Sequence, residues 1–240
     1  MKLSEIKRPT RLSIETSELQ YEFFVSNLCR NPKTKELEDI LIAPTLYVQG
    51  NNQTNVQLSP EMCSQSIFEG FNGYTYSLGK LNRLAEINLD KLISFLQIYF
   101  SLEGSKDILE KNADCKKCKQ YDIENIPKLT FGNLRNILSC IVKTDTSLHH
   151  LESLNTQEKR DNFTKIYNGY IEDRDCFTHG IMFFLYPDFK PVLRVKLENK
   201  LQYITFEKEV FVSNLEVFNY LTEILNAIRV HVQSKAKSVK

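Results

Sequence analysis

The residues best suited to chemistry lie close together at Arg174, Asp175 and His179. Asp175 and His179 are four positions apart, so on a helix their side chains share a face and can hydrogen-bond. This pairing favours the protonated imidazole and moves its titration toward neutral pH, where it can exchange protons with a substrate. A guanidinium at Arg174 can hold a phosphate. The three residue types therefore indicate proton transfer beside a bound anion.

A helix from about Glu158 to Phe184 is predicted to position these residues. Its apolar residues recur every three to four positions, at Phe163, Tyr167, Tyr170, Ile171 and Ile181. At about 100° per residue, Arg174 projects in nearly the same direction as Phe163, Tyr170 and Ile181. Thr178, Asp175 and His179 project to one side of that direction. A polar face therefore interrupts a buried stripe. A guanidinium there must find a carboxylate, a carbonyl oxygen or a phosphate.

A purely structural interpretation of the same residues also stands. Arg174 can pair with Glu172, with Asp173 or with a carboxylate distant in sequence, and His179 can cap the helix end near Gly180. An arginine and a histidine separated by four residues are common in proteins, so the pair alone does not decide between the two interpretations.

These residues resemble the motif of the HEPN domains (higher eukaryote and prokaryote nucleotide-binding). The ribonuclease members of this helical family carry an arginine, then a polar residue, and a histidine after four to six intervening positions. Arg174 and His179 have four residues between them, and Gly180 matches a glycine that often follows the histidine. Asp175 fills the polar position, where asparagine is commoner. The resemblance covers roughly residues 163–232, and nothing in the first 130 residues resembles the family.

The resemblance implies a mainly α protein, a HEPN-like helical bundle with a small β-hairpin between the motif helix and the last helix. We expect one helical domain over residues 1–240, with an unrecognised helical part at 1–130 and a HEPN-like core at 131–234. It also implies a metal-independent endoribonuclease without a cofactor, working as a homodimer whose two motifs line one cleft. Arg174 would bind and polarise the scissile phosphate, His179 would act as general base or acid, and Asp175 would orient the histidine.

The biological role that the resemblance implies is a toxin or antiphage defence effector, with RNA as substrate and an antitoxin or defence complex as a further partner. The alternative is a catalytically inactive HEPN-like module that binds a nucleotide or a protein within a defence complex. Lys165, Tyr170 and Thr178 are the candidate substrate-binding residues. Lysines and an arginine of the hairpin could add to an RNA surface, namely Lys190, Arg194, Lys196 and Lys200. For each of these, a solvated strand or a packed aromatic is the competing interpretation.

The remaining elements follow from periodicity and caps. A capping box at Ser17 predicts a first helix toward Leu28, and a broadly helical stretch from Ser64 to Ile87 contains glycines that favour breaks near Gly70 to Gly73. Asn88 or Asp90 would cap a central helix, Leu92 to Leu102. Further predictions are a helix at 133–142, a hairpin of 192–197 with 201–206, and a last helix opened by a capping box at Ser213.

Composition excludes several classes of function. The 31 lysines and arginines balance 30 aspartates and glutamates, so no global field draws the chain onto nucleic acid or anionic lipid. The first residues lack a signal peptide, and no run of eighteen apolar residues appears, so we expect a cytoplasmic protein without membrane contact. Six irregularly spaced cysteines predict reduced thiols. No Walker A sequence, dinucleotide-binding glycine pattern or His-Glu-x-x-His motif occurs.

Cys115 and Cys118 have the two-residue gap that lets both thiolates bind one zinc ion. A complete site needs two more ligands, for which Cys140, His149 and His150 are the candidates. No second half-site stands at a recognisable spacing, so two free cysteines in a charged loop are the competing interpretation. A zinc-stabilised interaction protein is therefore a third, weaker hypothesis.

Overall fold

The computed structural model describes residues 1–12, 20–24, 45–49, 54–57, 65–102, 104–105, 123–185, 190–197, 200–205 and 207–238. The chain divides into two compact units. The first comprises Met1–Arg8, Lys80–Asp175 and Lys208–Lys240, and the second comprises Pro9–Gly79 and Cys176–Glu207. Residues 131–234, which were predicted to form one core, contribute to both units.

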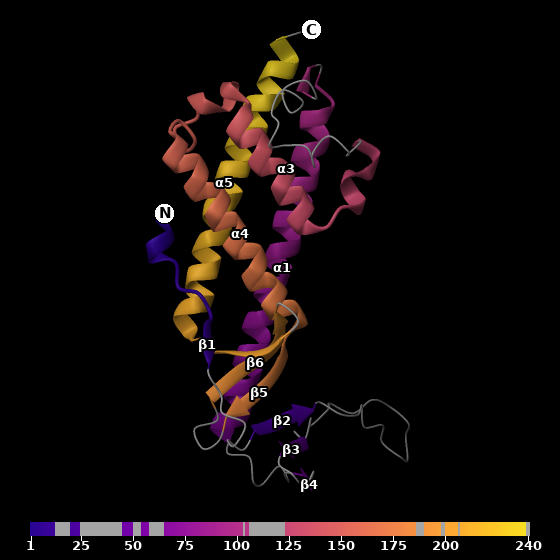
Figure 1. Ribbon diagram of the computed structural model, residues 1–240, viewed down its shortest axis with the longest axis vertical. Helices are drawn as coiled ribbons and strands as arrows, with labels where there is room; N and C mark the ends of the chain where they lie inside the picture. Colours follow the sequence, from indigo (N-terminus) through magenta and orange to yellow (C-terminus); the bar gives the residue numbers. More distant parts are fainter. Residues whose placement is uncertain are drawn as a thin grey trace. The chain divides into compact units, whose positions relative to one another are not determined.

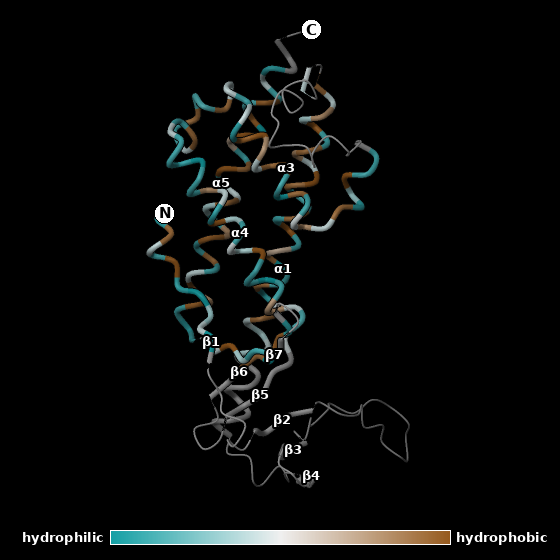
Figure 2. The backbone as a smooth tube through the Cα atoms, viewed as in Figure 1, coloured by the Kyte–Doolittle hydropathy of each residue, from teal (hydrophilic) through white to brown (hydrophobic). Residues whose placement is uncertain are grey.

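The first unit is a group of packed helices. It contains η1 (Leu3–Glu5), η5 (Ile123–Lys128), α3 (Phe131–Thr144), η6 (Thr146–His150), most of α4 (Gln157–His179) and α5 (Lys208–Ser238). Figure 1 shows α3, α4 and α5 running alongside the later part of α1 (Gln65–Phe100). One buried cluster joins all four, including Phe95, Leu134, Phe163, Tyr167 and Leu221. Brown and teal alternate along these helices in Figure 2, because each buries one face.

Helix α1 differs from the prediction of a broken helix followed by a separate capped one. It runs without interruption from Gln65 to Phe100, and nothing lies within 4 Å of a β-carbon added at Gly73 or Gly79. Asn88 is not a cap: it is fully buried inside the helix, and its side-chain oxygen accepts a hydrogen bond from the Tyr167 hydroxyl. Glycine lowers helix propensity by only about 1 kcal/mol, which burial of the apolar face outweighs.

The other helices of this unit are close to their predicted positions. Helix α3 confirms the helix predicted at 133–142, and the Thr130 hydroxyl caps its start by accepting from the Asn133 amide. The start predicted for the last helix is wrong, because α5 begins at Lys208 and Ser213 lies buried within it. The Ser213 hydroxyl instead accepts a hydrogen bond from the Lys7 amide at 2.9 Å, so its role is to bind the amino-terminal segment.

The second unit holds an antiparallel sheet of seven strands in the order β1-β7-β6-β5-β2-β3-β4. The strands are β1 (Thr10–Leu12), β2 (Gln20–Phe24), β3 (Thr45–Gln49), β4 (Thr54–Gln57), β5 (Ile181–Leu185), β6 (Lys190–Leu197) and β7 (Lys200–Thr205). The β6–β7 pair, with Val192 opposite Thr205, confirms the predicted hairpin between the motif helix and the last helix. Strand β1 pairs with β7, and so adds a third strand to that hairpin.

The helix predicted from Ser17 to Leu28 is wrong where the structure describes it. Residues Gln20–Phe24 form β2, which pairs with β3 on one side and with β5 on the other. Its aromatic and apolar residues also suit a strand, and pairing on both sides satisfies its backbone. The first 130 residues are therefore not wholly helical. Most described residues nevertheless lie in helices, so the mainly helical prediction is confirmed.

Candidate functional site

Helix α4 carries all the residues of the predicted motif. It begins beside Thr156, whose hydroxyl accepts a hydrogen bond from the Lys159 amide, and it ends at His179 rather than near Phe184. The Gly180 amide closes the last turn by donating to the Cys176 carbonyl at 2.8 Å. The next residues form β5, because Ile181 and its neighbours pair with β6. His179 is therefore the final helical residue.

Arg174 is bound by two carboxylates. Its Nη2 lies 2.7 Å from Oε1 of Glu86 in α1, and its Nη1 lies 3.1 Å from Oδ1 of Asp175. The Arg174 side chain is 21% exposed, whereas those of Glu86 and Asp175 are 45% and 53% exposed. Burial lowers the pKa of Arg174, but the hydrogen bonds and charges of both carboxylates raise it above its usual value overall. Arg174 therefore stays a guanidinium.

These contacts change the charge available to a ligand. One guanidinium with two carboxylates has a net charge of −1, so an approaching phosphate meets competing negative groups. Arg174 Nε is buried and has no hydrogen-bond partner among the described residues, so the donors left for a ligand are on the two Nη atoms. The structure thus contains the carboxylate distant in sequence that the structural interpretation of Arg174 requires.

His179 and Thr178 are both exposed at the end of α4. Within the described part of the chain, His179 makes no hydrogen bond or ion pair, so its ring is open to solvent. The expected hydrogen bond between Asp175 and His179 is not among the described contacts, and the Asp175 carboxylate accepts from Arg174 instead. Asp175 thus orients the arginine in this structure.

The remaining candidate substrate residues lie in two different settings. Tyr170 is only 4% exposed, so its ring packs in the core and is not available to stack on a base. Burial raises the pKa of its hydroxyl, and the charge of Arg174 offsets part of that rise. Lys165 is exposed, but it precedes Arg174 by nine residues, which is about 13 Å along a helix. Tyr167 and Phe177 are also buried core residues.

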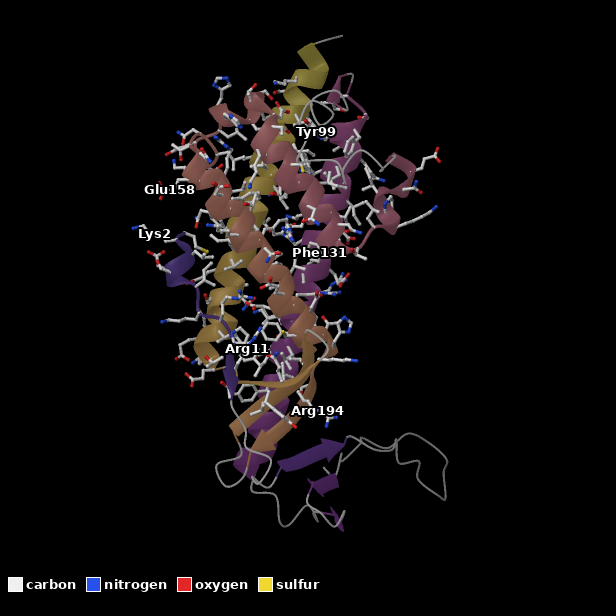
Figure 3. The ribbon with its side chains drawn as sticks, in the orientation of Figure 1. Lys2, Arg11, Tyr99, Phe131, Glu158 and Arg194 are labelled. Atoms are coloured by element: carbon white, nitrogen blue, oxygen red, sulfur yellow. The ribbon has the colours of Figure 1, made fainter. Side chains whose placement is uncertain are left out.

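Lys165 lines a broad groove of about 1180 Å³ at the amino-terminal end of α4. The amino-terminal segment, α4 and α5 supply its walls, and Figure 3 labels Lys2 and Glu158, which both line it. Its lining mixes three lysines with four acidic residues, namely Lys2, Lys159 and Lys165 with Glu152, Glu158, Asp161 and Glu223. Because the acidic side chains outnumber the lysines, the side-chain charges give this groove no preference for phosphate.

Two groups of interacting residues were not predicted from the sequence. Glu86 lies beside a buried face of α1 formed by Leu81, Ala85, Asn88 and Leu92, and an acidic residue bordering such a face is the signal that could have indicated it. Arg8 lies 2.7 Å from the buried Asp173 and 3.1 Å from Glu172, and it also donates to the Gly169 carbonyl. Arg8 lies in a polar amino-terminal segment, where the sequence gives no pattern that indicates a buried partner.

The cysteine and histidine candidates do not form a zinc site in the described residues. Cys115 and Cys118 lie outside those residues, so the hypothesis is untested for them. Cys140 is disulfide-bonded, which corrects the expectation of reduced thiols, while Cys176 is buried and is not part of a disulfide. The His149 Nε2 lies 3.3 Å from the Val142 carbonyl oxygen. No group of three metal-binding side chains occurs in the part of the chain that the structure describes.

No family model, curated protein or solved structure matches this chain. Among the described helices, none has a stretch both long and apolar enough to cross a bilayer.

Proposed function

We propose that this chain is a metal-independent endoribonuclease of the HEPN type, acting as a homodimer in defence or as a toxin. The observation that supports it is the pair on helix α4: Arg174 is held at two of its nitrogens, and His179 stands exposed without a described partner. A fixed guanidinium can stabilise charge on a phosphate, and a solvent-exposed imidazole can exchange a proton. Among the described histidines, His179 and His231 share a helix with a half-buried arginine. The arginine that accompanies His231 is Arg229 of α5.

The proposed reaction needs only these side chains and the substrate. The imidazole of His179 takes the proton of a ribose 2′-hydroxyl, and the oxygen attacks the adjacent phosphorus. The bond to the 5′-oxygen breaks, that oxygen takes a proton from the imidazolium of His179 in the second copy, and a 2′,3′-cyclic phosphate remains. Arg174 binds the non-bridging oxygens, where negative charge builds up. Whether a given His179 works as base or acid depends on how the two copies of the motif meet the substrate.

The test is incubation of purified protein with total RNA in EDTA. Wild-type protein should cut, and Arg174→Ala and His179→Ala should each lower the rate by about 100-fold or more. Arg11→Ala and His150→Ala remove the same two residue types from other exposed positions, and they should cut at the wild-type rate. Equal residual cutting in all five proteins would indicate contamination, and no cutting by the wild type would reject the proposal.

The ion pairs of Arg174 favour a second candidate, the catalytically inactive HEPN-like module. A guanidinium already neutralised by Glu86 and Asp175 has less attraction for a phosphodiester. The near-neutral net charge of +1 also fits a module that binds another protein. This candidate predicts that the wild-type protein, stable and folded, cuts no RNA at any pH from about 5 to 9, a range that includes both protonation states of an ordinary imidazole.

A further inference from the structure

We propose that Glu86 of helix α1 is the positioning residue of Arg174 and that its charge limits the access of phosphate to that guanidinium. The expected effects on RNA cleavage rest on the proposed function. The orientation of Arg174 and its binding of phosphate rest on the contacts of Arg174 alone. No sequence motif includes Glu86, which is 88 positions from Arg174.

The contact geometry assigns the positioning role to Glu86. Its Oε1 accepts from Nη2 at 2.7 Å, which is at the short end for a charge-assisted hydrogen bond. Asp175 accepts from the other terminal nitrogen, Nη1, at 3.1 Å. Acceptors at both ends of the planar group oppose its rotation about the Cζ–Nε bond. A lysine has one terminal nitrogen and does not offer this planar arrangement.

Asp175 is not able to replace Glu86 in this role. It is the residue next to Arg174 on α4, so it moves with the arginine and gives no reference to another element. Glu86 belongs to α1, and among the described residues its contact with Arg174 links that side chain to a second helix. The contact therefore fixes the guanidinium relative to the buried interface in which Asn88 of α1 meets Tyr167 of α4.

The same contact has an electrostatic consequence for a ligand. With Glu86 ionised, the group of Glu86, Arg174 and Asp175 carries a net charge of −1, and with an uncharged glutamine at 86 it is neutral. Glutamine keeps an oxygen that can accept from Nη2, so orientation is retained while the competing charge is lost. Glu86→Gln should therefore bind a phosphodiester more tightly, whereas Glu86→Ala should lose the orientation.

The experiment compares the wild type, Glu86→Gln, Glu86→Ala and the matched control Asp90→Asn. Asp90 is an exposed carboxylate one turn further along α1, without a hydrogen bond or ion pair among the described residues. Binding is measured by fluorescence anisotropy with a labelled 2′-O-methyl oligoribonucleotide, which has no 2′-hydroxyl to react. Glu86→Gln should lower the Kd about two- to fivefold, and Asp90→Asn should leave it unchanged.

Orientation is measured separately by ¹⁵N NMR of the arginine side chains, with Arg174 assigned through Arg174→Lys. We expect separate signals for the two Nη atoms in the wild type and in Glu86→Gln. In a folded Glu86→Ala protein we expect these signals to be averaged. In RNA cleavage, Glu86→Ala should lower kcat at least about tenfold and Glu86→Gln should lower KM. Averaged Nη signals in the wild type, or a Glu86→Gln Kd equal to that of Asp90→Asn, would overturn the inference. If the wild type cuts no RNA while the NMR and binding results hold, the ribonuclease function fails and the role of Glu86 in holding Arg174 stands.

Discussion

Gly180, which directly follows the motif histidine, is required by close packing in the second unit. A β-carbon at this position would lie 2.5 Å from the Cys176 carbonyl oxygen and 3.0 Å from Val195 Cγ1. Because one of these neighbours is backbone, the clash is not relieved by a change of rotamer. The glycine that matches the family pattern therefore has a structural reason that does not depend on catalysis.

We predict opposite effects of alanine at two glycines. Gly180→Ala should lower the free energy of unfolding by about 1–3 kcal/mol through this overpacking. Gly79→Ala, at a helical position with nothing within 4 Å of the added carbon, should raise it by about 0.5–1 kcal/mol. Urea denaturation of both variants measures the difference. Equal stability of the two variants would contradict the packing described around Gly180.

At the scale of single residues, the sequence supported the position of Arg174 but not its partner. Helical spacing placed Arg174 beside a buried stripe, and the side chain is indeed only 21% exposed. The same spacing allowed a phosphate, Glu172, Asp173 or a carboxylate distant in sequence as the partner of the guanidinium. Choosing among these required knowing that α1 brings Glu86 alongside α4, which is a tertiary contact between residues 88 positions apart. Asp173, one of the alternatives, instead binds Arg8.

At the scale of elements, the amino-terminal segment is fixed to the helices by a polar clamp. Arg8 Nη2 lies 2.7 Å from Asp173 Oδ1 and 3.2 Å from the Gly169 carbonyl oxygen. Burial raises the pKa of Asp173, and hydrogen bonds from Arg8 and Asn214 offset part of the rise. A β-carbon at Gly169 would come within 3.3 Å of the Arg8 guanidinium, so the glycine permits this close approach.

We expect Arg8→Ala to destabilise the protein by about 2–3 kcal/mol, because Asp173 would remain buried without its cation. Adding Asp173→Asn to this variant should recover part of the loss, since the uncompensated charge is then gone. A double-mutant cycle followed by thermal or urea unfolding measures the coupling. Additive effects of the two substitutions would show that the clamp does not stabilise the fold.

Elements with a strong local pattern were predicted well, and those defined by tertiary pairing were not. The β6–β7 hairpin and α3 have alternation or helical spacing together with a turn or cap, and both were confirmed. Strand β2 carries apolar residues at spacings that also fit a helix, and its pairing with β3 and β5 decided the outcome. In α1, burial of one face outweighed the glycines that predicted a break.

At the scale of the whole molecule, His231 makes stability depend on pH. It lies in α5, and its Nε2 is buried without a hydrogen-bond partner among the described residues. Burial lowers the pKa of His231 below 6.5, Lys235 and His150 lower it further, and Asp145 opposes them. Asp145 also accepts a hydrogen bond from the Tyr99 hydroxyl at 3.2 Å. The folded protein therefore takes up this proton less readily than the unfolded chain.

This difference sets the sign of the pH effect. Because the unfolded chain binds the proton first, the stabilisation is present above pH 6.5 and is lost as the pH falls through the lower pKa of the folded state. Wild-type protein should lose more stability than His231→Gln between about pH 7.5 and 5.5. The exposed His179→Gln serves as control and should follow the wild type. An identical pH dependence of His231→Gln and the wild type would contradict this account.

The net charge of the whole chain is only +1, too small to attract RNA, so the proposed activity depends on local chemistry at α4. The most direct test is cleavage, in EDTA, of a defined RNA that the wild type cuts and of the same RNA with one 2′-deoxynucleotide at the cut. The account predicts loss of cleavage at that linkage alone, 2′,3′-cyclic phosphate ends on the normal substrate, and no cleavage by Arg174→Ala or His179→Ala. Cleavage at the 2′-deoxy linkage, products with 5′-phosphates, or activity that survives both substitutions would contradict it.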